Sequence, residues 1–170
     1  MILGMSLATF TLFHVILSLI GILAGAVVVV GMLGSKPLDG WTAIFLATTV
    51  LTSVTGFFFP SDKILPSHIV GILSLVVLAL AILGFYVYHL AGSWRWIYVV
   101  TAVVALYFNV FVGVVQAFGK VSFLHAQAPT QSEPPFIVAQ AIVLVIFIAL
   151  GFKAIRSFHP ATVVPASRPA

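Results

Sequence analysis

Hydrophobic residues fall into five long runs along the chain, separated by short segments rich in polar residues, glycine and proline. The runs cover residues 7–33, 41–59, 67–90, 94–118 and 135–155. About 20 apolar residues are enough for a helix to cross a hydrocarbon core of roughly 30 Å. No water is available there to pair backbone groups, so each run is expected to be helical. The pattern predicts an all-α polytopic membrane protein, a bundle of five transmembrane helices.

The five runs are expected to form a single transmembrane domain over residues 1–155. The run at 7–33 has no basic segment before it and is about twice as long as the apolar region of a signal peptide, so it is read as a retained helix. Residues 156–170 contain three prolines and no hydrophobic periodicity. They are predicted to form a flexible C-terminal tail.

Composition supports lipid as the surrounding solvent. Hydrophobic residues make up 62% of the chain and charged residues only 6%, whereas soluble domains carry about 25% charge. The net charge of +4 comes from scattered basic residues, which do not form the face needed to bind nucleic acid. Cysteine is absent, which excludes disulfides, thiolate zinc sites and iron–sulfur clusters.

The distribution of basic residues predicts an orientation. Five spans place Lys63 and Lys120 on the side of the N-terminus, and put the other basic residues on the opposite side: Lys36, Arg95, Lys153, Arg156 and Arg168. The positive-inside rule then places the N-terminus outside and the C-terminus in the cytoplasm, most simply in a bacterial inner membrane. An aromatic belt is expected at the inner boundary, formed by Trp41, Tyr86, Tyr88, Trp94, Trp96 and Tyr98.

No charged residue falls in the middle of any run. Ion-coupled pumps usually carry such residues, so this class is disfavoured. The chain has none of the familiar catalytic or nucleotide-binding motifs. An enzymatic activity is therefore not indicated.

Neutral polar side chains gather at one level of the predicted bundle. Under the topology above, the outer half holds His14, Thr55, His68, Gln116 and Gln140, and Asn109 lies nearer the middle. His14 and His68 stand on parallel helices at depths that differ by only about 3–6 Å. Two facing imidazoles are suitable ligands for haem iron, copper or zinc. They predict a metal or b-type haem site, with Asn109, Gln116 and Gln140 as its surrounding polar residues.

A second arrangement adds a third histidine. His125 lies in the polar segment between the last two runs, close to Glu133. Together with His14 and His68, these side chains could bind zinc or copper at the outer surface. The same segment carries signals for a helix start, with Ser132 as the expected cap, Glu133 favouring the positive end of the helix, and Pro134 and Pro135 in the first turn.

Three functions follow from these patterns. The first is a membrane-embedded bundle that binds a b-type haem or a metal and transfers electrons to or from a quinone or a periplasmic partner. The second is a non-catalytic subunit or assembly factor, with a partner or a second copy packing on Gly21 and Gly25 and on the face formed by Thr48, Thr52 and Thr55. The third is a neutral-solute channel or a quinone- or lipid-binding protein lined by Thr48, Thr52, Asn109 and Gln116.

Overall fold

The computed structural model describes residues 2–61 and 66–160. These residues form helices in the order α1 (Leu7–Leu33), α2 (Asp39–Gly56), α3 (Pro66–Ile82), η1 (Leu83–Val87), α4 (Trp94–Lys120), α5 (Ser122–Gln127) and α6 (Pro134–Ser157). η1 is a short π-helical continuation of α3. Within these two stretches no β-strand is present, and the only bridge joins Ile2 and Met5. The predicted all-α class is confirmed.

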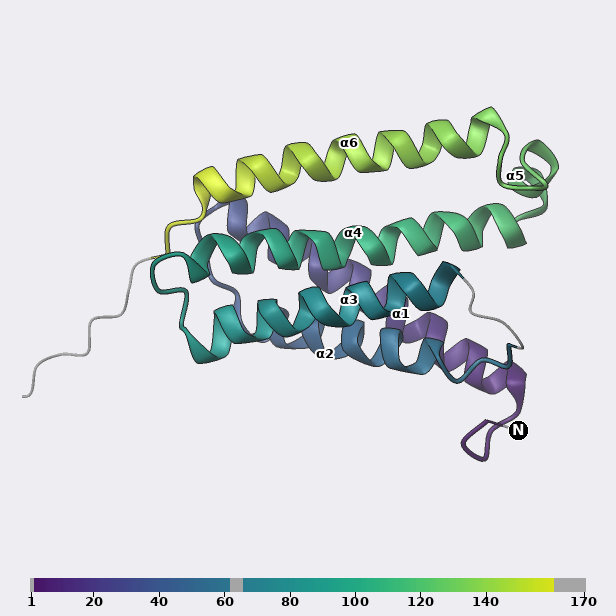
Figure 1. The fold of residues 1–170 in the computed structure, drawn as a ribbon, viewed down its shortest axis with the longest axis horizontal. Coiled ribbons are helices and arrows are strands. Elements are labelled where there is room, and N and C mark those ends of the chain that lie inside the picture. The colour runs from purple at the N-terminus through teal and green to yellow at the C-terminus, as the bar shows by residue number, and fades with distance from the viewer. Residues whose placement is uncertain (1, 62–65, 161–170) are drawn as a thin grey trace, which may run out of the picture.

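The long helices lie side by side along one axis, while the six-residue α5 turns back at one end (Figure 1). The N-terminal segment lies at the same end of the bundle as α5, and α6 ends at the opposite end (Figure 1). We call these the N-terminal end and the opposite end. All five predicted hydrophobic runs are therefore helical and adjacent in space.

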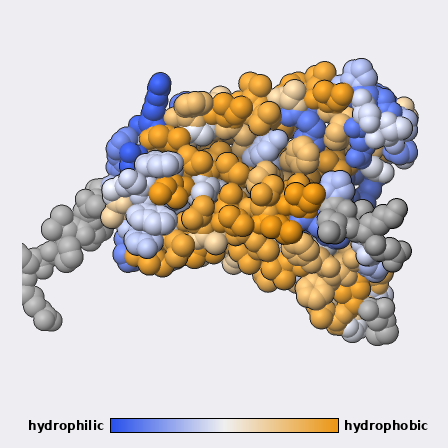
Figure 2. Space-filling view, in the orientation of Figure 1, coloured by the Kyte–Doolittle hydropathy of each residue, from blue (hydrophilic) through white to orange (hydrophobic). Residues whose placement is uncertain are grey.

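Four helical segments of the described chain are long and apolar enough to cross a membrane: Leu7–Leu33, Pro66–Val87, Trp94–Lys120 and Pro134–Ser157. Their side chains form an orange apolar band between two polar ends in Figure 2. These features indicate a membrane protein. The remaining helix, α2, is only 18 residues long, begins at Asp39 and contains five threonines, which lowers its hydropathy below that of the others. Five spans are therefore not established by helix length and composition alone.

Helix α1 packs closely against α2 and α4 through glycine. A Cβ added to Gly25 would lie 2.6 Å from a methyl carbon of Leu106 and 2.8 Å from the ring of Phe45, and one added to Gly21 would lie 3.0 Å from Asn109. Both glycines are buried. The GxxxG face predicted as a contact for a second protein is thus already covered by helices of this chain.

The main apolar core fills the half of the bundle nearer the opposite end. Its largest buried side chains include Met32, Phe45, Leu78, Tyr98 and Phe158. Tyr98 was expected in an interfacial belt but is only 1% exposed. Gly84 explains the difference, because it lets η1 pack closely on Tyr98. A Cβ added to Gly84 would lie only 3.1 Å from the Cβ of Tyr98. Trp41, Tyr86, Tyr88 and Trp96 remain exposed, as expected for interfacial residues.

Helix α6 extends into the predicted tail. It continues to Ser157, and Phe158 is buried next to Tyr98, with ring centroids 6.1 Å apart. The packed part of the chain therefore extends to at least residue 158, where Phe158 contacts Tyr98 of α4. Residues 161–170 of the predicted tail lie outside the described residues.

Candidate functional site

A small pocket lies between α1, α2, α3 and α4 in the half of the bundle nearer the N-terminal end. Its volume is about 90 Å³, and it is partly open. All four helices contribute lining residues: His14, Ser18, Thr52, Ser53, Gly56, Phe57, Ser67, His68, Val70, Gly71, Ser74, Phe108, Asn109 and Val112. No Asp, Glu, Lys or Arg is among them. The part of the lining that the structure describes is therefore uncharged when its histidines are neutral.

His14 is held by a hydrogen bond to a threonine of the neighbouring helix. Its Nδ1 lies 2.8 Å from Thr55 Oγ1. The Thr55 hydroxyl donates its single proton to the carbonyl oxygens of its own helix, at 2.7 Å to Leu51 and 3.2 Å to Thr52. With the hydroxyl proton on these carbonyl oxygens, Thr55 Oγ1 accepts from His14, which assigns the proton to Nδ1. In the neutral ring Nε2 is left with a lone pair.

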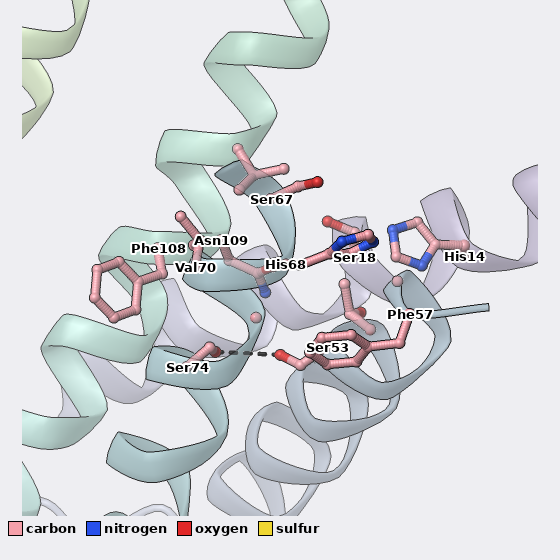
Figure 3. Close-up of a pocket in the computed structure, with 14 residues that line it drawn as sticks. His14, Ser18, Ser53, Phe57, Ser67, His68, Val70, Ser74, Phe108 and Asn109 are labelled. Atoms are coloured by element: carbon pink, nitrogen blue, oxygen red, sulfur yellow. Dashed lines mark hydrogen bonds between the residues drawn. The ribbon is translucent and has the colours of Figure 1, made fainter. Parts of the chain in front are cut away.

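The same ring is fixed from its other side by aromatic contact. Phe59 meets His14 edge-on, with ring centroids 5.2 Å apart at 85°. Figure 3 shows the His14 ring turned toward His68 across the pocket. No donor among the described residues reaches Nε2. His14 therefore presents a hydrogen-bond acceptor, or a metal-ligating nitrogen, to the pocket.

His68 comes from the first turn of α3 and forms the facing wall. Its ring is stacked on Phe57 with centroids 5.7 Å apart and planes 21° from parallel. Gly71, one turn further along α3, makes this possible because a Cβ there would lie 3.1 Å from the Phe57 ring. Figure 3 shows the His68 ring beside His14, with Phe57 on another side of His68.

The floor of the pocket is built from hydroxyl and amide groups. Ser53 donates to Ser74 at 3.2 Å, which joins α2 to α3 (Figure 3). Asn109 Nδ2 donates to Thr49 Oγ1 at 3.4 Å, which joins α4 to α2. Deeper in the bundle Phe45 and Leu106 fill the space beside Gly25. The polar lining ends there, so the arrangement does not resemble the predicted solute channel.

The structure brings together some of the predicted site residues and separates others. His14, His68 and Asn109 line one pocket. Gln140 instead donates to the Phe111 carbonyl at 3.2 Å, because α6 packs against α4 and α1 rather than beside the pocket. Gln116 is exposed and does not line the pocket.

The predicted three-histidine site is not assembled. His125 is an exposed residue of α5 and is not among the pocket residues. Across residues 2–61 and 66–160, no three His, Cys, Asp or Glu side chains are grouped so that they could hold a metal ion. The reason is local: α5 turns back at the end of α4, and Glu133 is engaged by Thr130 and Ser132.

Sequence reasoning missed the residues that complete the pocket. Thr55 was assigned to helix packing, yet its hydroxyl is the hydrogen-bond partner of His14 Nδ1. Ser53, Ser67 and Phe57 were not assigned to the site, although all three line it. The sequence offered one signal for these residues, which is their position. Ser53 and Phe57 lie within three residues of the end of α2, and Ser67 directly precedes His68.

Comparison of the chain with protein-family models, curated protein sequences and solved structures found no match. The function is therefore inferred from the geometry of this site.

Proposed function

We propose that this chain is a five-span integral membrane protein that binds a small uncharged ligand in the pocket between α1, α2, α3 and α4. The observation that carries the proposal is the hydrogen bond from His14 Nδ1 to Thr55, which leaves the Nε2 lone pair facing the cavity. A neutral imidazole nitrogen with an open lone pair accepts a hydrogen bond from a donor group. A ligand with such a group in the pocket would make that bond with His14.

The fifth span in this proposal is α2. A helix of 18 residues is about 27 Å long at the usual rise, close to a hydrocarbon thickness of roughly 30 Å. The helix packs along α1 from Phe45, which lies beside Gly25, to Thr55, which is hydrogen-bonded to His14. With α2 crossing, the N-terminus is outside, the C-terminus is cytoplasmic, and the pocket lies in the outer half of a bacterial inner membrane.

The size of the pocket favours a small ligand over the predicted haem. Sites for cofactors and drug-sized ligands usually enclose about 300–1,000 Å³, and this pocket measures about 90 Å³. Phe57 lines the same pocket and is stacked on His68, which further reduces the space beside that ring.

The topology is tested with single cysteines, for which this cysteine-free chain is well suited. One cysteine is placed at Gly4 and another at Ser157, at the two ends of the bundle. In intact cells an impermeant thiol reagent should label the Gly4→Cys variant alone. Labelling of both variants, or of neither, would place both termini on one side and contradict five spans.

The ligand is tested by extracting small molecules from protein purified in mild detergent and quantifying them by mass spectrometry. A compound present at near one per chain in the unmodified protein should be lost in His14→Phe, which keeps a ring but removes Nε2. The matched control is His125→Phe, at an exposed position outside the pocket. Identical extracts from all three proteins would contradict the proposal.

A further inference from the structure

We infer that the pocket accepts the head group of a hydroxylated aromatic compound, a phenol or hydroquinone whose hydroxyl donates to Nε2 of His14. This inference rests on the proposed function and narrows it to one ligand class. Four properties of the pocket lead to it: its charge, the direction of its hydrogen bond, its shape and its size.

Charge excludes ionic ligands. The lining residues include no Asp, Glu, Lys or Arg, and an unpaired ion in an apolar environment is strongly disfavoured. None of the described residues that line the pocket would supply a counter-charge to a carboxylate, phosphate or ammonium group. The ligand that fits is neutral in the bound state.

The hydrogen bond at His14 has a fixed direction. Because Nδ1 donates to Thr55 Oγ1, a neutral ring can only accept at Nε2. The complementary ligand group is a donor, and a hydroxyl is the simplest neutral one. A ketone, an ether or an oxidised quinone offers only acceptors at this position and fits less well.

The walls of the pocket suit a flat ring. His68 and Phe57 form a nearly parallel pair, and Phe108 lines the pocket from α4. Gly56 lies beside His14, since a Cβ there would be in ordinary contact with His14 Cε1 at 3.8 Å. Aromatic rings pack well on such surfaces in offset-stacked or edge-to-face contact.

Size limits the ligand to one ring. An apolar cavity of about 150 Å³ binds benzene, and this pocket of about 90 Å³ is partly open. One edge of a six-membered ring, with its hydroxyl, enters, and the rest of the molecule lies in the opening. Two sources supply this chemistry: a membrane hydroquinone with a long apolar tail, or a soluble phenol.

The inference is tested by ligand-induced thermal stabilisation of the full chain in mild detergent. The probes are a decyl-substituted hydroquinone, its dimethyl ether and plain phenol. A compound that binds only the folded state raises the melting temperature with concentration. We expect the hydroquinone to do so, and the dimethyl ether, which cannot donate, to bind roughly tenfold more weakly or not at all.

Two variants locate the effect. His14→Phe should abolish the difference between the hydroquinone and its ether, whereas His125→Phe should keep it. Plain phenol binding as tightly as the decyl compound would identify a soluble ligand, and a clear advantage of the decyl compound would identify a membrane hydroquinone. Both results support the ligand class.

The opposing result is equal stabilisation by the hydroquinone and its ether, or no stabilisation by any of the three probes. If the extracts described above nevertheless contain a His14-dependent compound without an aromatic hydroxyl, the ligand class is wrong and the binding function stands. If they contain no His14-dependent compound, the binding function fails as well.

Discussion

The guanidinium of Arg95, at the start of α4, donates to the carbonyl oxygen of Phe158 at 2.6 Å and to that of Ile155 at 3.2 Å. These acceptors belong to the last turn of α6 and the residue after it. The contact pairs carbonyl groups that a helix C-terminus leaves without intrahelical partners, and it places a positive charge at the negative end of the helix dipole. It joins two helices that are far apart in the sequence.

Replacing Arg95 by alanine is expected to destabilise the bundle. Hydrogen bonds from charged donors contribute roughly 1.5–3 kcal/mol, and two carbonyl groups would lose their donor. The measurement is the melting temperature in mild detergent. Arg156→Ala is the matched control, since Arg156 is exposed on α6. Equal losses in the two variants would show that the Arg95 contact is unimportant.

Gly25→Ala is expected to lower stability by about 1–3 kcal/mol, the usual range for overpacking a core. The new methyl group would meet Leu106 and Phe45 at 2.6 and 2.8 Å, and neither side chain has free space because all three residues are buried. Gly113→Ala is the control within a helix, since its Cβ would lie 3.8 Å from Ile22. Unfolding curves for the two variants should diverge, and overlapping curves would refute the packing argument.

Protein purified from cells with an adequate haem supply is expected to show no stoichiometric haem absorption. The reason is the pocket volume of about 90 Å³, well below the roughly 300 Å³ at which cofactor sites begin. Oxidised and dithionite-reduced spectra check this directly. Sharp Soret and α bands at one haem per chain, lost in both His14→Ala and His68→Ala, would reverse the conclusion and restore the electron-transfer hypothesis.

The segment before α6 should loosen in acid. Desolvation acts to raise the pKa of Glu133, but hydrogen bonds from Thr130 and from the Ser132 backbone outweigh it and hold that pKa below its usual value. A lowered folded-state pKa means that the carboxylate stabilises the segment above its unperturbed pKa of about 4.3. The contribution is lost as pH falls through the lowered value.

This loss can be followed through the amide proton shifts of Thr130 and Ser132, which donate to Glu133 at 3.1 and 3.0 Å. Both should titrate together, with a midpoint below the ordinary pKa of a glutamate side chain. Glu133→Gln should remove the transition. A midpoint above that value in the unmodified protein would contradict the lowered pKa.

Glu133 also shows where sequence signals for helix ends were incomplete. Ser132 was the predicted cap of the last helix, but Glu133 occupies the N-cap position and Pro134 and Pro135 follow in the first turn. The proline prediction is confirmed because proline geometry is local. The predicted N-cap, Ser132, is one residue too early. The Glu133 side chain turns back and accepts a hydrogen bond from the Thr130 hydroxyl.

Helix positions and the similar depth of His14 and His68 could be predicted, because both depend on distance along a helix. Which helices become neighbours could not. Gln140 is placed at a suitable depth but on α6, where the Phe111 carbonyl of α4 is its partner. The role of Thr55 depends on how α2 is rotated against α1, and hydrophobic periodicity does not determine that rotation when apolar residues surround most of each helix.

The main apolar core fills one half of the bundle, and the pocket lies in the other, where Ser53–Ser74 and His14–Thr55 are contacts between polar side chains. Exchange of a bound molecule would then require only the N-terminal end of the helices to separate. The tightly packed half would serve as a fixed base, so opening would be local and would not require unfolding of the protein.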